Sequence, residues 1–485
     1  MDEDVEKLKR IRAELRRTGR VESNAELMDA LGMRGARRRE LQVRRVRSAS
    51  GICVIAIMTR PYACPGKCIY CPTSEKAPKS YTGEEPAALR ARQNGFDAAR
   101  QVRSRIEQLE AIGHEPSKCE LIVMGGTFNY QPKRYRDAFM KKAYEAFNGR
   151  KSATLAAAQK ANERAKHRVI GLTFETRPDW CSEAQVKEFL DYGATRIELG
   201  VQSLDEDVLR RVNRGHDVAK VAEATRTCKD AFLKVGYHMM PGLFADARKD
   251  AEMFRRLFSD ERFKPDMLKI YPCLVLEGTP LYDLWKKGKF KPYSAEEAAK
   301  AIAECKRFVP PYCRVMRIDR DIPTKLIVDG VKKSNLRELV RDEMEERDVK
   351  CNCIRCREVG LAGGKIGKTA MHRFDYKASG GKETFLSFDD EKSGLLVAYL
   401  RLRERADGVF GVRELRVLGE QTPVGDESRL AQHRGLGGEL LVEAERIARN
   451  CGARELLVLS GIGARPYYRK QGYKLRGGCM VKGLP

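Results

Sequence analysis

Between residues 51 and 310, short apolar segments alternate with longer amphipathic segments. The apolar segments have strand length, and we expect strands at Val54–Thr59, Leu121–Met124, Val169–Phe174, Arg196–Gly200, Val235–Met240 and Met267–Tyr271. The amphipathic segments predict helices at Pro86–Ile112, Lys133–Phe147, Glu183–Tyr192, Val218–Leu233, Lys249–Phe258 and Ala295–Phe308. Repeated strand–helix units require right-handed crossovers and a parallel sheet. The pattern therefore predicts an α/β fold with a partial (β/α)6 barrel, whose working residues lie at strand carboxyl ends.

Three cysteines follow the first predicted strand in the run Ala63-CPGKCIYCP-Thr73. Cys64, Cys68 and Cys71 have the spacing C-x3-C-x2-C, and no later nearby cysteine completes a set of four. Three thiolates on a 4Fe–4S cluster leave one iron open, and that iron can bind the amino and carboxylate groups of S-adenosylmethionine. One electron then cleaves the sulfonium and gives a 5′-deoxyadenosyl radical. A zinc site and buried unligated thiols are the alternatives, but structural zinc prefers four protein ligands.

Polar or glycine-rich signals occur at the ends of the later strands. Met124-GGT-Phe128 resembles the second radical-SAM motif, in which the glycine backbone, here Gly125 and Gly126, binds the amino group of S-adenosylmethionine. Glu175-TRP-Asp179, Glu198-LGVQ-Ser203, Asn213-RG-His216 and Lys269-IY-Pro272 follow in phase with the strands. We count Gln202 among the cofactor-binding candidates. Each signal alone could be a turn, but their common phase favours a site.

Residues 311–370 break the strand–helix rhythm and contain the run Cys351-N-Cys353-I-R-Cys356. Three thiolates at this spacing can face one ion, and zinc needs a fourth ligand, for which Cys313 and His372 are the candidates. The favoured interpretation is a structural zinc site at a domain junction. A second iron–sulfur cluster and unligated cysteines remain alternatives.

From Ser387 the pattern changes to antiparallel strands, including Gly394–Arg403 and Val412–Gly419, followed by Gln432-HRGLG-Gly438 at a helix start. Q-x-x-G-x-G in this context is typical of GNAT acetyltransferases, whose turn binds the pyrophosphate of coenzyme A through backbone N–H groups. Glu455-LLVLS-Gly461 and Pro466-YYRKQG-Tyr473 then match the next strand and the helix that carries a tyrosine general acid. Tyr468 has the usual spacing for the general acid, and Tyr467 is the alternative. A tyrosine here could instead be a core aromatic residue without a catalytic role.

The bulk composition limits the class of protein. The formal net charge is +25 in 485 residues, and residues 1–50 form an arginine-rich arm that ends with Arg34-GARRRELQVRRVR-Ser48. Such a charge favours a polyanionic partner, here tRNA bound through its phosphates, although a solvated charged helix could have the same composition. No segment has the ~20 apolar residues of a membrane span, and the charged N-terminus lacks a signal core. Fifteen cysteines in metal-like clusters favour a reducing cytoplasm.

Taken in order, the motifs resemble the catalytic subunit of Elongator in its stand-alone bacterial or archaeal form. The resemblance runs from the basic arm to Lys482 and is carried by Met124-GGTF, Glu175-TRPD, Asn213-RGH, Arg320-DIP, Arg357-EVG, Gln432-H-x-G-x-G and Tyr467-YRK-x-GY. It divides the chain into the arm (1–50), a radical-SAM barrel (51–310), a linker with the zinc candidates (311–370) and a GNAT-type α+β domain (371–485).

The resemblance implies a tRNA carboxymethyluridine synthase. In this chemistry the deoxyadenosyl radical removes hydrogen from the methyl group of acetyl-CoA, the carbon radical adds to carbon 5 of the wobble uridine, and thioester hydrolysis leaves a carboxymethyl group. Lys118 is similar to the family's lysine that contacts acetyl-CoA from the barrel. The other acetyl-CoA residues implied are Glu414, Leu415, Arg416, Val417, Gln432, His433, Arg434, Gly435, Leu436 and Gly437.

The resemblance further implies an electron donor and no obligatory Elongator subunits, and it leaves a homodimer open. Two departures affect the cluster loop. Eukaryotic members space the first two cysteines more widely, and many members have Pro-Gly-Gly after the third, where this chain has Pro72-Thr-Ser74. The competing functions are a protein lysine acetyltransferase with a vestigial barrel and a tRNA-binding scaffold without turnover.

Overall fold

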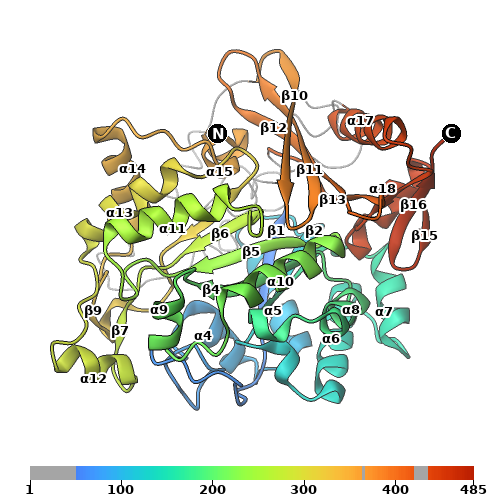
Figure 1. Ribbon diagram of the computed structural model, residues 1–485. Coiled ribbons are helices and arrows are strands. Elements are labelled where there is room, and N and C mark those ends of the chain that lie inside the picture. Colours follow the sequence, from blue (N-terminus) through green and yellow to red (C-terminus); the bar gives the residue numbers. More distant parts are fainter. Residues whose placement is uncertain (1–50, 363–365, 420–434) are drawn as a thin grey trace, which may run out of the picture.

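The computed structural model describes residues 51–362, 366–419 and 435–485 of the chain (Figure 1). The basic arm at residues 1–50 and the segment 420–434 lie outside the described residues. Within the described ranges, no helix is both long and apolar enough to cross a bilayer. A barrel-like domain comes first, and a mixed-sheet domain follows it (Figure 1).

The barrel domain contains seven strands in the order β1-β2-β3-β4-β5-β6-β8, and every neighbouring pair is parallel. The strands are β1 (Cys53–Met58), β2 (Lys118–Met124), β3 (Arg168–Thr176), β4 (Arg196–Gln202), β5 (Lys234–Met239), β6 (Met267–Ile270) and β8 (Arg314–Ile318). The six predicted strands correspond to β1–β6. β8 adds a seventh strand from residues that the sequence pattern assigned to the linker, because helix α13 returns the chain to the open edge beside β6.

Helices connect the strands and cover the sheet (Figure 1). They are α4 (Pro86–Gln93), α5 (Ala98–Ala111), α6 (Lys133–Asn148), α7 (Leu155–Asn162), α8 (Glu183–Asp191), α9 (Glu206–Arg211), α10 (Val218–Asp230), α11 (Ala247–Ser259) and α13 (Ala295–Arg307). The sequence pattern predicted these helices except α7 and α9, with α4 and α5 as one helix, and capping residues fix several ends. Ser182 and Ser294 each form a capping box with the residue three positions later.

The single helix predicted at Pro86–Ile112 is wrong, because the chain forms two helices there. Gly95 and Phe96 take left-handed conformations with φ of 58° and 55°, which a helix cannot accommodate. Asp97 then caps α5 by accepting a hydrogen bond from the Arg100 N–H at 3.0 Å. The sequence Asn-Gly-Phe-Asp therefore combines a helix stop with a new helix start.

Short elements join the two domains and extend the barrel. They are α12 (Pro280–Lys286), α14 (Leu336–Glu346), α15 (Ile354–Arg357), α16 (Val359–Ala362) and the antiparallel pair β7 (Val275–Leu276) and β9 (Ile327–Asp329). The backbone N–H of Ile354 donates to the carbonyl of Cys313 at 2.9 Å, and this bond ties α15 to the residue before β8.

The second domain is a seven-stranded sheet in the order β10-β11-β12-β13-β14-β16-β15. Its elements are β10 (Thr369–Ala378), β11 (Gly381–Asp390), β12 (Leu396–Glu404), β13 (Phe410–Val417), α17 (Leu436–Asn450), β14 (Glu455–Val458), α18 (Arg465–Lys470), β15 (Lys474–Arg476) and β16 (Cys479–Gly483). All strand pairs are antiparallel except β13 with β14. The sequence pattern predicted this change to antiparallel strands.

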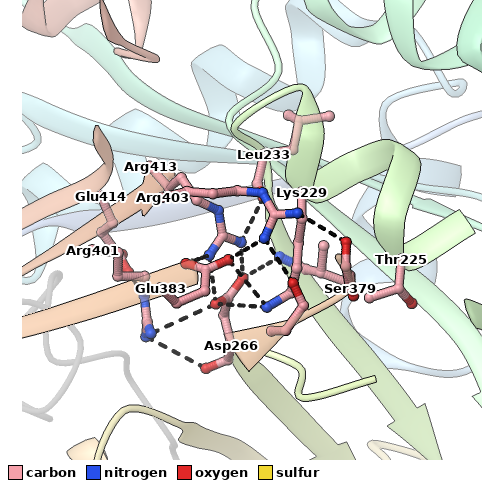
Figure 2. A network of polar contacts seen from close by, with 12 residues as sticks. Thr225, Lys229, Leu233, Asp266, Ser379, Glu383, Arg401, Arg403, Arg413 and Glu414 are labelled. Carbon is pink, nitrogen blue, oxygen red and sulfur yellow. Dashed lines mark hydrogen bonds and ion pairs between the residues drawn. The ribbon is translucent and has the colours of Figure 1, made fainter. Parts of the chain in front are cut away.

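Buried ion pairs hold the two domains together (Figure 2). Asp266, just before β6, pairs with Arg413 of β13 through both carboxylate oxygens, one of them 3.0 Å from Arg413 Nη1. Arg413 also contacts Glu383 of β11 at 2.9 Å, and Lys229 of α10 lies 3.5 Å from Glu383. These side chains are at most 1% exposed. Burial alone would raise the pKa of Asp266, but Arg413 and Lys229 hold it well below its usual range.

Glycines allow the domains to approach closely at two further points. A Cβ on Gly461 would lie 2.1 Å from the carbonyl oxygen of Ile170 in β3, and one on Gly411 would lie 2.4 Å from the ring of Phe232. Real Cβ atoms do not come this close to backbone or ring atoms. A side chain at either position would therefore push the second domain away from the barrel.

Asp266→Asn should destabilise the protein by about 3–5 kcal/mol, because it leaves Glu383 as the one shared counter-charge of the buried Arg413 and Lys229. Chemical denaturation measures this change. Asp407→Asn is the matched control, since Asp407 makes an ion pair with Arg405 while 51% exposed, and its effect should stay within about 0.5 kcal/mol. Equal stability of the two variants would contradict a structural role for the buried network.

Candidate functional site

A first cavity of ≈ 150 Å³ opens at the carboxyl ends of the barrel strands, where Cys64, Cys68 and Cys71 line it together. The loop that carries them follows β1. Cys68 is buried, and the other two are half-buried. The structure thus brings together the three thiols that the sequence singled out.

Two arginines from the strand-end motifs contact the central cysteine. Arg214 Nη1 donates to the Cys68 sulfur at 3.3 Å, and Arg177 Nη1 does so at 3.7 Å. A hydrogen bond from Cys71, together with both guanidinium groups, lowers the pKa of Cys68 to about 4 against the effect of burial. Cys68 is therefore favoured as the thiolate, which is the form that ligates iron, while the pKa of its partner Cys71 is raised by the same hydrogen bond and by burial.

The other candidates at this end lie around the same cavity. Gly126 lines it, and a Cβ on the adjacent Gly125 would lie 2.1 Å from Thr59 Oγ1. Both glycines have positive φ. Gln202, the last residue of β4, also lines the cavity and has a φ of 72°. A turn with these conformations exposes backbone N–H groups toward a ligand.

A string of charged side chains runs down the inside of the barrel from this cavity. Tyr81 donates to Glu175 at 2.7 Å, Lys269 bridges Glu175 and Glu198, and His238 Nε2 lies 2.9 Å from Glu198. Burial would raise the pKa of Glu198, but Lys269, His238 and Arg196 hold it well below its usual range. The lumen is therefore polar, and its charges are paired.

A second cavity of ≈ 530 Å³ lies at the opposite, amino ends of the barrel strands, against the second domain. Lys118, the first residue of β2, lines it. So do Glu414, Leu415, Arg416, Val417, Gly435, Leu436, Gly437, Tyr467 and Tyr468. The structure thus places the barrel lysine beside the residues predicted to bind acetyl-CoA. Gln432, His433 and Arg434 lie outside the described residues.

Helix α17 begins at this cavity. Gly435 is its N-cap residue, with a left-handed φ of 77°, and the helix runs for 15 residues. Its first N–H groups have no partners within the helix, and the helix dipole adds positive potential there. This is the geometry of a phosphate-binding helix start.

The two tyrosine candidates of α18 differ in environment. Tyr467 is 40% exposed, and its hydroxyl lies 3.2 Å from the place where a Cβ on Gly437 would be. Tyr468 is 6% exposed and packs in the core of the second domain. Burial raises the pKa of both phenols. Both therefore remain protonated at neutral pH, as a general acid requires, and Tyr467 lies closer to the turn.

Sequence reasoning missed the barrel residues that line the second cavity. These are Glu120, Arg168, Thr195, Arg196 and Lys234. They lie at or near the amino ends of β2–β5, whereas active sites of (β/α) barrels normally lie at the carboxyl ends of the strands. Charged residues at the first positions of otherwise apolar strands could have indicated this site. Such residues are seldom buried without a partner.

The sulfur atoms of Cys351, Cys353 and Cys356 lie within 4.8 Å of one another, as a shared metal ion requires. Neither of the proposed fourth ligands belongs to this group. Cys313 is buried beside Cys353, and His372 is exposed on β10. Lys306 Nζ lies 3.8 Å from the Cys356 sulfur.

Comparisons with known proteins agree with this geometry. Residues 58–257 match the radical SAM superfamily, and residues 265–346 match the radical SAM C-terminal domain. The chain is 49% identical over 468 residues to the tRNA uridine(34) acetyltransferase of Methanocaldococcus infernus, covering 92% of this chain and 88% of that protein. Human Elongator complex protein 3 is 43% identical over 472 residues, or 92% and 86% of the two chains.

The chain belongs to the Elongator catalytic subunit family. The solved structure of Methanocaldococcus infernus Elp3 with an N-terminal deletion matches with a TM-score of 0.81 and 45% identity, over 90% of this chain and 100% of that one. The recognition made from the motifs is confirmed, as is the fold class of a radical-SAM half-barrel followed by a mixed-sheet domain.

Radical-SAM membership implies a 4Fe–4S cluster and S-adenosylmethionine. The residues present fit both groups. Three cysteines line one cavity with two arginines directed at the central sulfur, and a glycine turn and Gln202 border the remaining space.

Replacement of Cys64, Cys68 and Cys71 by serine should remove the cluster, because no other cysteine of the described ranges lines this cavity. Anaerobically reconstituted wild-type protein should contain about four iron atoms, the stoichiometry of the cluster, and the triple variant should contain none while remaining folded. Cys451→Ser, at an exposed position on the second domain, is the control. Full iron content and S-adenosylmethionine cleavage in the triple variant would overturn the assignment.

Proposed function

We propose that this protein converts the wobble uridine of tRNA to 5-carboxymethyluridine, with acetyl-CoA as the source of the added carbons. The observation that carries the proposal is the pair of cavities in one barrel. One holds the cysteine triad, and the other faces the start of α17. Relatives with 47–49% identity carry the name tRNA uridine(34) acetyltransferase.

The second cavity would bind acetyl-CoA. Backbone N–H groups at Gly435 and Gly437, together with the start of α17, suit the pyrophosphate. Lys118 would contact the cofactor from the barrel side, and the backbone of Glu414–Val417 would hold the pantetheine arm. The Tyr467 or Tyr468 hydroxyl would protonate the departing thiolate.

The first cavity would hold the cluster and S-adenosylmethionine, which together supply a deoxyadenosyl radical that removes hydrogen from the acetyl methyl group. The side chains of the first cavity position the cluster and S-adenosylmethionine and shield them from solvent. Arg177 and Arg214 stabilise the Cys68 thiolate, and the glycine turn with Gln202 orients the ligand. An external electron donor is required.

Binding of tRNA accounts for the excess positive charge of +25. The arm at residues 1–50 remains the predicted phosphate-binding segment. We place the protein in the cytoplasm, a location supported by fifteen cysteines that are all free thiols. A homodimer remains open, and no Elongator subunit is required by the proposal.

Acetyl-CoA with a trideuterated methyl group separates this function from protein acetylation. The carboxymethyl reaction breaks one methyl C–D bond, so we expect deuterium in 5′-deoxyadenosine and two deuterium atoms in the product uridine. A lysine acetyltransferase never breaks those bonds and would leave the label whole on lysine. Mass spectrometry of both products makes the measurement. Unlabelled 5′-deoxyadenosine together with labelled acetyl-lysine would refute the proposal.

We also propose that Cys351, Cys353 and Cys356 bind a structural zinc ion with one further ligand, supported by the mutual distances of their sulfur atoms. Cys353→Ser should abolish zinc content and lower the melting temperature, since Cys353 is fully buried beside β8. Its iron content should not change, because the cluster cavity is lined by other residues. Zinc-free wild-type protein, purified without chelator and measured by elemental analysis, would contradict this site.

A further inference from the structure

Arg196 lies between the two cavities of the barrel. It is the first residue of β4 and lines the second cavity. Glu198, two residues later on the same face of the strand, lines the first cavity. Arg196 Nε lies 3.2 Å from Glu198 Oε1, and Nη2 pairs with Glu120, which also lines the second cavity. A single guanidinium therefore connects the wall of one cavity to that of the other.

The guanidinium is buried, yet part of its hydrogen-bonding capacity is unused. Arg196 is 2% exposed, and Nη1 contacts the sulfur of Met267 at 3.6 Å. Nε and Nη2 have charge partners but no hydrogen-bond acceptor in good geometry among the described residues. Leaving buried donors unsatisfied costs about 1–3 kcal/mol each. Both nitrogens thus face carboxylates at ion-pair distance, and their hydrogen-bond geometry to Glu120 and Glu198 is incomplete.

Neighbouring charges keep this side chain cationic. Burial alone would lower the pKa of Arg196, but Glu120 and Glu198 raise it above its usual value. A cationic donor in a dry site stabilises developing negative charge on oxygen much more strongly than it would in water.

We propose that Arg196 binds the thioester carbonyl oxygen of acetyl-CoA and directs the acetyl group along the barrel toward the first cavity. The inference rests on the proposed function and adds a residue to it. In the hydrolysis step, a water oxygen bonds to the carbonyl carbon and the carbonyl electron pair moves onto the oxygen beside Arg196. The carbon–sulfur bond then breaks. The leaving thiolate takes up one proton, and the new acid releases the other.

Arg196→Lys tests this role, because it keeps the positive charge between Glu120 and Glu198 but loses the forked donors. Coenzyme A release from acetyl-CoA, in the presence of total tRNA, should fall by about 10²–10³-fold, the effect of removing one oxyanion donor. Affinity for coenzyme A without the acetyl group should stay unchanged, because the pyrophosphate turn is untouched. Arg255→Lys, on the exposed face of α11 beside Glu252, is the matched control.

A second measurement reports the contact directly. A ketone analogue of acetyl-CoA, with CH₂ in place of sulfur and a ¹³C carbonyl, should show a downfield shift of its carbonyl resonance when bound to the wild-type protein. The shift should be lost in Arg196→Lys and retained in Arg255→Lys. Should Arg196→Lys fail to fold, Glu120→Gln combined with Arg196→Gln removes one opposite pair of charges together and takes its place.

Two outcomes would overturn the inference: wild-type rates of coenzyme A release in the Arg196 variants, or an unshifted carbonyl in the wild-type complex. Failure of the proposed function has a different signature. In that case the wild-type protein transfers no deuterium to 5′-deoxyadenosine, whatever the state of the bound carbonyl.

Discussion

The buried ion network between the domains is the interaction on which the rest of the structure depends. Asp266, Glu383 and Arg413 are removed from water, and buried charges are tolerated only when each finds its counter-charge (Figure 2). Because these ion pairs are directional, they form only in one relative orientation of the two domains. Glu414, adjacent to Arg413 on β13, is held in the same network by Arg401 at 2.9 Å. The network thus places the cavity-lining face of β13, and with it the starts of α17 and α18, opposite the amino ends of the barrel strands.

This placement leaves a cavity at each end of the barrel strands. The cysteine cavity lies where strands of this fold class normally carry their chemistry. The second cavity lies a strand's length away, about 20 Å for the seven residues of β2. Paired charges such as Lys269–Glu198 lie in the barrel between the two cavities.

Elements whose signals are local were predictable from the sequence. β1–β6 follow from apolar runs, and the cysteine triad follows from spacing alone. The break between α4 and α5 depends on a left-handed pair, Gly95 and Phe96, within a continuous amphipathic pattern. β8 was assigned to the linker because a strand's sheet is set by its partners, and β6 lies more than forty residues earlier in the chain. The sequence pattern identifies Arg196 only as the start of a strand. Its position between two cavities depends on the packing of the strands and the second domain.

The sequence by itself determined the family and the fold class, and it named the candidate binding residues. Motif spacing along a loop or at a helix start can be recognised without knowing the fold. Only the tertiary structure decided that Lys118 meets Gly437 and Tyr467 in one cavity, since they are brought together by the docking of two domains. It also decided that Arg196 stands between the two cavities. The physical reason is that burial, charge pairing and access belong to the packed molecule, and a residue's place in the chain does not encode which side chains will surround it.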